Sequence, residues 1–268
     1  MFDPASDASQ HGGAPPASGR GSIWWPTDYD PSPPEGPVDL VIPALNEADN
    51  LPHVLDAVPH RWIRRVVVVD NGSTDDTGRV AERAGAEVVR EPQRGYGAAC
   101  LAGLDHLASS PPEVVAFIDA DFSDDPSQLP RVLAPIVDGD VDLSIGTRTV
   151  GARQPGALPP HAKFGNKLAC LLMDLFFDYE FTDLGPFRAI RWPALKRLDM
   201  RDRDFGWTVE MQVKAARRGL SAAEVPVDYR RRRAGESKVT STLYGSTMAG
   251  AKIFWTVLAE YARAGRPE

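Results

Sequence analysis

Short apolar runs alternate with helical patterns over residues 38–146 of the chain. The apolar runs are residues 38–43, 65–69, 86–90, 114–118 and 141–145, and each has the length of a buried strand. The segments between them, at 51–58, 76–84, 95–108 and from 125 onward, carry apolar residues at helical spacing. Strands that alternate with helices are typical of a doubly wound, mostly parallel sheet. We therefore predict an α/β fold for this part of the chain.

The pattern changes after Gly146 to loops, long helices and short strands, without a separable second unit. We predict one continuous domain over 38–263, with a first half at 38–146 and a second half at 147–263, followed by a short tail at 264–268. Residues 1–37 are rich in Pro, Gly, Ser and Asp, and such a composition buries too little apolar surface to order itself. We predict a disordered tail there, in which Ile23-Trp24-Trp25 is the exception that could dock onto the domain.

Two carboxylates end the predicted central strand. Asp119 and Asp121 directly follow residues 114–118, where the sheet of an open α/β fold binds its ligands. Alternate residues of an extended chain point the same way, so both carboxylates can face one ligand. They would repel each other unless a cation lay between them. We predict Mg²⁺ or Mn²⁺ shared with substrate phosphates, the alternative being that the two residues cap the next helix.

Polar residues also follow the first two strands. Asn46 and Glu47 come after the first strand, and Asp70 with Gly72 after the second. The carboxyl ends of parallel strands meet at one edge of the sheet, so these clusters should converge with the carboxylate pair on one crevice. Acidic side chains there suit ribose hydroxyls or base N–H groups, which makes Glu47 and Asp70 candidate nucleoside ligands. Asp70 could instead be a turn residue, because it precedes Asn-Gly.

Two further stretches are candidates for phosphate contacts. Gly95-Tyr96-Gly97 opens a helix, but it lacks the full GxGxxG pattern, so a plain helix start explains it equally well. Arg230 to Arg233 with Lys238 is the strongest basic cluster in the chain, and it adjoins a flexible Gly-Glu-Ser-Lys loop that could close over phosphates. A solvated charged face is the alternative.

Composition and net charge indicate the environment in which the protein works rather than the chemistry it carries out. The net charge of −7 argues against a general nucleic-acid binder. Cys100 and Cys170 are too few for a disulfide framework or a zinc site. Residues 1–20 lack the apolar region of a secretory signal, and no apolar run has the length of a membrane span. We expect a cytoplasmic protein, with a peripheral position at the inner face of the membrane as the alternative.

Four motifs together resemble family 2 glycosyltransferases of the GT-A fold, in the branch of the polyprenyl- (dolichyl-) phosphate mannosyl- and glucosyltransferases. They are Val41-Ile-Pro-Ala-Leu-Asn-Glu47, Val69-Asp-Asn-Gly-Ser-Thr-Asp-Asp-Thr77, Gly95-Tyr-Gly-Ala-Ala99 and Asp119-Ala-Asp121. The resemblance continues through Thr182-Asp-Leu-Gly-Pro-Phe-Arg188 and Gly235-Glu-Ser-Lys238 and covers residues 38–260. It implies a metal-dependent, inverting transfer of a hexose from a nucleotide sugar, with a nucleotide-sugar half at 38–146 and an acceptor half at 147–263.

The resemblance also assigns residues to roles. It implies that Asp119 and Asp121 hold the metal and the donor diphosphate. The nucleoside pocket is expected from Pro43, Leu45, Glu47 and Asp70, with Gly72 beside them. Ser123 stands where many members have Gln as a further metal-side ligand, so coordination here could be looser or completed by water. Members often carry a C-terminal transmembrane region, which the residues up to Glu268 lack, so a lipid acceptor is less firmly implied than sugar transfer.

The second half supplies the candidates for acceptor binding. By the family's spacing, Arg232, Ser237 and Lys238 are expected phosphate contacts, and Arg148 and Arg188 are further candidates. A phosphate acceptor is already anionic near neutral pH and needs no strong general base. A hydroxyl acceptor would need one, and Asp183 is the best-placed carboxylate for it, unless it serves only as a turn residue before Gly185-Pro186.

Two predicted apolar helices each allow two interpretations, which differ in whether the protein contacts a lipid, a membrane or a second subunit. Residues 168–177 could be a core helix or a surface for a lipid chain or the bilayer, and 244–261 could lie in a membrane interface or pack on a second subunit of a homodimer. Our hypothesis is a glycosyltransferase that uses a UDP- or GDP-linked sugar and Mg²⁺ or Mn²⁺, with polyprenyl phosphate as first acceptor and a soluble hydroxyl compound as second. A nucleotidyltransferase and a non-catalytic nucleotide-binding module are the rival classes. The first would carry a Gly-rich basic loop where Ala44-Leu45-Asn46-Glu47 stands, and the second would tolerate loss of the carboxylate pair.

Overall fold

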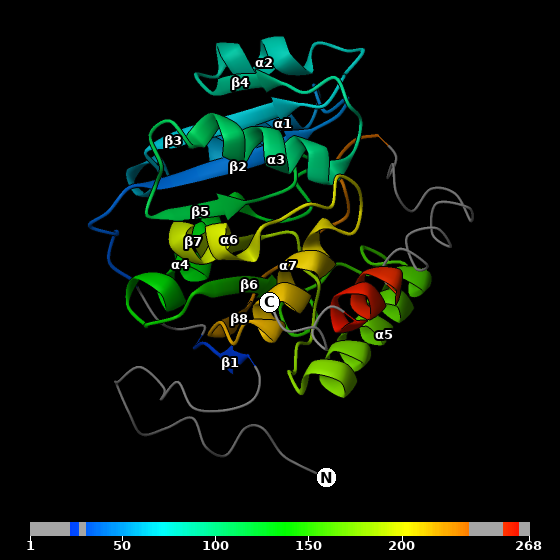
Figure 1. Cartoon of the computed structure of the whole chain (residues 1–268). Helices are drawn as coiled ribbons and strands as arrows, with labels where there is room; N and C mark the ends of the chain where they lie inside the picture. Colours follow the sequence, from blue (N-terminus) through cyan, green and yellow to red (C-terminus); the bar gives the residue numbers. More distant parts are fainter. Residues whose placement is uncertain (1–21, 27–30, 236–253, 263–268) are drawn as a thin grey trace.

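The computed structural model describes residues 22–26, 31–235 and 254–262. In these residues eight strands form a single sheet in the order β1-β8-β6-β7-β5-β2-β3-β4 (Figure 1). The strands are β1 (Ile23–Trp24), β2 (Val38–Ala44), β3 (Arg65–Asp70), β4 (Glu87–Arg90), β5 (Val114–Phe117), β6 (Leu143–Thr147), β7 (Arg188–Arg191) and β8 (Ala222–Pro226). Only β7 runs antiparallel to its neighbours within this sheet, so the predicted mostly parallel α/β fold is confirmed.

Helices cover both faces of the sheet. They are α1 (Leu51–Ala57), α2 (Thr77–Arg83), α3 (Tyr96–Leu107), α4 (Leu129–Val137), α5 (Pro160–Phe177), α6 (Trp192–Leu198) and α7 (Trp207–Arg217), with short 3₁₀ turns η1 (His60–Trp62) and η2 (Pro126–Gln128). Buried residues of α3, α5, α6 and α7 form one hydrophobic cluster, and those of α1, α2 and α4 form another on the opposite face. The sheet is therefore doubly wound, as the alternation of strand and helix predicted.

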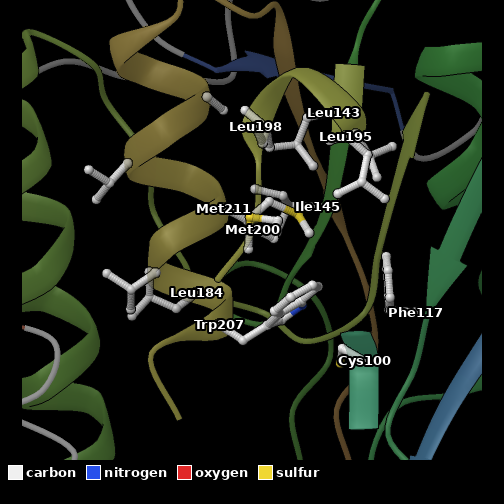
Figure 2. Packing of buried hydrophobic residues seen from close by; sticks show 14 of the residues in the cluster. Cys100, Phe117, Leu143, Ile145, Leu184, Leu195, Leu198, Met200, Trp207 and Met211 are labelled. Carbon is white, nitrogen blue, oxygen red and sulfur yellow. The ribbon is translucent and has the colours of Figure 1, made fainter. Parts of the chain in front are cut away.

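The central strands supply side chains to both clusters. Val115 and Phe117 of β5 belong to the first cluster, whereas Val114, Ala116 and Ile118 belong to the second. This alternation is the period of two that an extended chain imposes, and it explains why the strand is apolar throughout. Figure 2 shows the first cluster, in which the ring of Trp207 from α7 meets Phe117 edge-on with centroids 6.1 Å apart. This core lies directly behind the end of β5.

The segment around Trp25 is part of the sheet. β1 pairs in parallel with β8, and the Trp25 N–H donates to the Glu224 carbonyl at 3.1 Å. The Trp25 side chain is 6% exposed and packs with Ala134 and Val225. The docking of Ile23-Trp24-Trp25 that the sequence left open thus takes place, because an edge strand offers unpaired backbone groups and the indole finds an apolar site.

The second half of the chain places two helices side by side. The described C-terminal residues 254–262 are helical and lie next to α5, where the rings of Tyr261 and Phe176 are 4.7 Å apart (Figure 1). The predicted amphipathic helix at 244–261 is described only from residue 254. Within the described part of the chain, no helix combines the length and the apolar character that crossing a bilayer requires.

Candidate active site

A cavity of about 860 Å³ opens at the carboxyl ends of β2 and β5. Its wall combines the loops that follow these strands with the start of α3, one face of α5 and the segment after β8. The sequence-predicted residues that line it are Pro43, Leu45, Glu47, Asp119, Asp121, Arg148 and Arg232. Of the three strand-end clusters predicted to converge, Asn46 with Glu47 and Asp119 with Asp121 line this cavity. Asp70, Gly72, Asp183 and Arg188 are not among its lining residues, and Ser237 and Lys238 lie outside the described residues.

The loops after β2 and β3 are joined by hydrogen bonds. The Asn46 N–H donates to the Ser73 hydroxyl at 2.9 Å, and the Asn46 side-chain oxygen accepts from the Thr74 N–H at 2.7 Å. The Glu47 N–H donates to the Thr77 hydroxyl at 2.8 Å. Asn46 itself adopts the left-handed conformation, with φ of 52°. These bonds fix the backbone that carries Glu47 to the cavity wall and explain why Ser and Thr stand at the start of α2.

The two strand-end carboxylates lie in different surroundings. Oδ1 of Asp119 is buried and has no hydrogen-bond partner, while Tyr96 from α3 hydrogen-bonds the same carboxylate. Oδ1 of Asp121 accepts from the Ser123 N–H at 2.9 Å. Burial, and next the neighbouring Asp121 carboxylate, raise the pKa of Asp119. A carboxylate with one buried, unpartnered oxygen, under the electrostatic influence of a second carboxylate, is the arrangement that a bound cation would relieve.

Arg232 connects the carboxylate pair with the loop after β2. Its guanidinium reaches Oε1 of Glu47 at 2.7 Å and Oδ2 of Asp121 at 3.1 Å. The other carboxylate oxygen of Glu47 accepts from the Asn50 side chain at 2.7 Å. Burial works against the charged guanidinium, yet Asp121 and Glu47 together raise the pKa of Arg232 above its ordinary value. Glu47, predicted as a nucleoside ligand, is thus part of an ion-pair network with the predicted metal ligand.

Arg148 and Asp183 form a second ion pair at the other side of the cavity. Nε and Nη2 of Arg148 each donate to Asp183 at 2.8 Å, and the Arg148 N–H donates to the same carboxylate at 2.7 Å. The Leu184 N–H adds a fourth bond to Asp183 at 2.8 Å. Burial alone would raise the pKa of Asp183, but Arg148 and these donors bring it below its ordinary value. A carboxylate held in this way is a poor proton acceptor, which does not fit the general base expected for a hydroxyl acceptor.

The start of α3 is a packing site. The N–H groups of Gly97 and Ala98 donate to the carbonyls of Asp204 and Arg203 at 3.1 and 2.8 Å. A Cβ on Gly97 would lie 2.0 Å from the Asp202 carbonyl oxygen, and Gly95 has φ of 147°. The glycines therefore allow the loop before α7 to approach the helix closely. These two N–H groups are engaged, so the structure favours the helix-start interpretation over the phosphate-binding turn.

Arg188 was expected at a phosphate, and the structure corrects this. Its side chain is fully buried, and it donates to the carbonyls of Gly185, Leu184 and Thr208 and to the Gln212 side chain. A guanidinium whose donors are spent on backbone carbonyls braces the turn after Asp183 and does not reach the cavity. Arg188 is the first residue of β7, where buried polar groups need partners within the protein.

Asp70 and Gly72 lie beside the cavity. Oδ1 of Asp70 accepts from the Ser73 N–H at 2.9 Å, which is the turn role that the sequence left open. Gly72 has φ of 77°, which the turn requires. The cavity wall is instead formed by Asn71, whose side chain bonds the Gln93 carbonyl and the Gly95 N–H at 2.7 and 2.8 Å. The nucleoside role of Asp70 stays a prediction.

Several wall residues were not singled out from the sequence. Tyr96 lies within Gly95-Tyr-Gly-Ala-Ala99, and Asn71 directly follows Asp70. The sequence patterns around both residues were interpreted only as a helix start and a turn, not as parts of the cavity wall. Tyr229 lies under Arg148, whose guanidinium carbon is 5.1 Å from the ring centroid, and its only sequence signal is its place next to the basic cluster that begins at Arg230. The remaining unanticipated wall residues include Arg94, Ala162, Asn166, Asp204 and Phe205.

Comparison with known sequences gives one family. Residues 39–198 match the family described as Glycosyl transferase family 2. An uncharacterized glycosyltransferase of Mycobacterium tuberculosis is 40% identical over 224 residues, which cover 83% of this chain and 98% of the relative. The undecaprenyl-phosphate mannosyltransferase of Micrococcus luteus is 32% identical, over 78% of this chain and 89% of its own. The polyprenol monophosphomannose synthase of Mycolicibacterium smegmatis is 30% identical, over 76% and 81%.

Solved structures agree on the fold. Glucosyl-3-phosphoglycerate synthase from Mycobacterium tuberculosis, in complex with Mn²⁺, UDP and phosphoglyceric acid, superposes with a TM-score of 0.69. The match covers 92% of this chain and 87% of that chain at 21% sequence identity. At this level of identity the likeness concerns the arrangement of the sheet and its helices, and it matches the α/β sheet described above.

Proposed function

Because the chain belongs to glycosyltransferase family 2 and is thus a hexosyltransferase, we propose that it moves a hexose from a UDP- or GDP-linked donor to polyprenyl phosphate, with inversion at the anomeric carbon. The observation that carries the proposal is the convergence of Glu47, Asp119 and Asp121 with Arg232 and Arg148 on one cavity. Acidic groups for a nucleoside and a cation thus adjoin basic groups for phosphates. The first half of the chain supplies the acidic groups, and Arg148 and Arg232 of the second half supply the basic ones.

The donor set fits a divalent cation shared with a diphosphate. Asp119 offers a buried oxygen without a hydrogen-bond partner, and Asp121 lies two residues along the chain. No group of three or more His, Cys, Asp or Glu side chains in the described residues is arranged to hold a metal. Mg²⁺ typically takes one or two carboxylates and completes its shell with water and substrate phosphates, so a two-carboxylate site suits it. When bound, such a cation neutralises the charge that builds on the departing diphosphate.

The chain's own residues would then position donor and acceptor. Glu47 and the loop after β2 hold the nucleoside end, and Arg232 can donate two parallel N–H groups to phosphate oxygens. A phosphate oxygen of the acceptor attacks the anomeric carbon, the bond from that carbon to the diphosphate breaks, and its electron pair leaves with the nucleoside diphosphate. Arg148 faces the cavity from the acceptor half and suits the acceptor phosphate.

Two observations favour a phosphate acceptor over a hydroxyl compound. Asp183, the carboxylate predicted as general base, is engaged by Arg148 and does not line the cavity. An anionic phosphate needs no such base. The second observation is α5, which lines the cavity through Ala162 and Asn166 and exposes Phe164, Leu171 and Leu175 on its outer side. Exposed apolar side chains beside the cavity suit contact with a lipid chain or with the membrane periphery.

A donor screen tests the proposal. Nucleoside diphosphate release is followed with UDP- and GDP-linked hexoses in Mn²⁺ or Mg²⁺, with and without a short polyprenyl phosphate, and repeated after chelation of the metal. We expect release that requires both the metal and the lipid phosphate. Release stimulated only by hydroxyl compounds would contradict the proposed acceptor.

A further inference from the structure

We infer that Arg232 pairs with Asp121, the proposed metal ligand, when no metal or nucleotide is bound. The divalent cation displaces the guanidinium from Asp121, and the nucleoside diphosphate attracts it away. The two ligands therefore bind cooperatively. The inference rests on the proposed function, because it needs a metal and a diphosphate at this site. It goes beyond that function by assigning to Arg232 a role before the donor arrives. The role is competition with the metal.

The geometry of the ion pair supports this role. Nη2 of Arg232 lies 3.1 Å from Oδ2 of Asp121, and Nη1 lies 2.7 Å from Oε1 of Glu47. The Arg232 side chain is 20% exposed, and both carboxylates are more buried than that. Partly buried ion pairs are screened less than exposed ones, so this contact stabilises the position of the guanidinium between the two carboxylates. The guanidinium thus takes the place of a cation between two carboxylates from different loops.

Both oxygens of Asp121 are engaged in this state. Oδ1 accepts from the Ser123 N–H at 2.9 Å, and Oδ2 faces Arg232. A metal ion that binds Oδ2 must displace Arg232 or share the oxygen with it, and one that binds Oδ1 still meets a carboxylate whose charge Arg232 neutralises. Sharing places two positive groups on one carboxylate oxygen, which repel each other at short range. In the absence of a nucleotide, Arg232 therefore lowers the affinity of the site for the metal.

A diphosphate draws Arg232 away from Asp121 and so raises the affinity of the site for the metal. The planar fork of arginine matches phosphate oxygens and forms two parallel charge-assisted bonds with them. Arg232 lies on the segment after β8, which touches the loop after β2 through the bond from the Asn50 side chain to the Ala234 carbonyl at 3.1 Å. A short turn of the guanidinium from Asp121 toward the incoming phosphates would free Oδ2 for the metal. Binding of either ligand then favours the other, and the coupling is reciprocal.

Metal binding without turnover tests the inference. Mn²⁺ binding is measured by calorimetry or electron paramagnetic resonance with and without UDP or GDP, for the wild type, Arg232→Gln and Arg231→Gln. Arg231 is the matched control, because it is the adjacent arginine and its side chain bonds the Pro155 carbonyl at 2.7 Å, away from the carboxylates. We expect Arg232→Gln to bind Mn²⁺ alone about tenfold more tightly and to lose about tenfold of the coupling between metal and nucleotide. Arg231→Gln should match the wild type.

The conservative variant and the opposite results complete the test. Arg232→Lys keeps the charge without the fork, so it should resist Mn²⁺ alone as the wild type does yet respond less to the nucleotide; it also serves if Arg232→Gln does not fold. Unchanged Mn²⁺ affinity and unchanged coupling in Arg232→Gln, with normal nucleotide-dependent metal binding in the wild type, would overturn the inference and leave the proposed function standing. A wild-type protein that binds neither UDP nor GDP with Mn²⁺ would overturn both.

Discussion

Arg148 and Asp183 meet in a two-point ion pair, with Nε and Nη2 of the guanidinium each 2.8 Å from a carboxylate oxygen. The pair joins the loop after β6 to the turn before β7, and both side chains are largely buried. Asp183 thereby sets the direction in which Arg148 faces the cavity. This relationship changes the interpretation of Asp183 from a proton acceptor to a positioning residue, and it leads to two predictions.

Asp183→Asn should destabilise the protein. Loss of one partner leaves the Arg148 charge buried and uncompensated, which typically costs about 3 to 5 kcal/mol in the free energy of unfolding. Urea unfolding measures this cost. The pKa of Asp183 is lower in the folded protein than in the unfolded chain, so its contribution is fully present above the unfolded pKa and is lost as the pH falls through the folded pKa. The variant should therefore lose part of the acid sensitivity of the wild type. Wild-type stability in Asp183→Asn would show that the pair contributes little.

Arg148→Lys should impair use of the acceptor phosphate. Lysine keeps the positive charge but cannot hold Asp183 at two points or present a planar fork to a phosphate. Because hydrogen bonds to charged groups contribute about 1.5 to 3 kcal/mol, kcat/KM for the phosphate acceptor should fall on the order of 10- to 100-fold. Arg153→Lys is the control, since Arg153 is exposed and touches only the rim of this region through the Arg148 carbonyl. Equal kcat/KM in both variants would remove Arg148 from the acceptor site.

Trp25→Ala should weaken the whole fold, although the residue precedes the predicted domain. Its indole is buried against α4 and β8, and truncating a buried Trp costs about 3 to 5 kcal/mol in the free energy of unfolding. The neighbouring Trp24 is 46% exposed, so Trp24→Ala should cost less than about 1 kcal/mol. Chemical denaturation of both variants provides the comparison. If they are equally stable, the docking of β1 does not contribute to folding in solution.

Gly97→Ala should lower the stability of the protein, whereas Gly165→Ala should not. A Cβ at Gly97 would collide with the Asp202 carbonyl at 2.0 Å, and the resulting shift should cost about 1 to 3 kcal/mol of stability. Gly165 lies inside α5 with nothing within 4 Å of an added Cβ, and alanine there should stabilise by up to about 1 kcal/mol. Thermal melts of the two variants decide this. A Gly97→Ala protein as stable as the wild type would mean that the loop before α7 can move away freely.

The sequence predicted the alternating strands and helices of residues 38–146 and the meeting of two strand-end clusters, for physical reasons. Periodicity identifies buried strands, and the carboxyl ends of parallel strands meet at one edge, so Glu47, Asp119 and Asp121 could be placed together without coordinates. The glycosyltransferase family and the α/β fold are confirmed by the sequence match and the sheet. The domain boundaries at 37 and 263 stay predictions.

The rest depends on contacts between distant segments. That Asp183 pairs with Arg148, 35 residues earlier, cannot be seen in local patterns, and neither can the burial of Arg188 among carbonyls. β1 was missed as a strand because two residues carry no periodicity, and only the free edge of β8 gives them a partner. The basic cluster illustrates the same limit: Arg232 faces the carboxylates, whereas its neighbour Arg231 bonds the Pro155 carbonyl.

In the proposed function, Asp119 and Asp121 bind one divalent cation beneath the diphosphate of a nucleotide sugar. The most direct measurement is a crystal structure of the protein with Mn²⁺ and UDP or GDP, in which anomalous scattering locates the metal. We predict one peak in contact with a carboxylate oxygen of Asp119 or Asp121 and with the diphosphate, with Glu47 beside the nucleoside. A nucleotide bound elsewhere, or a metal that contacts neither aspartate, would contradict it.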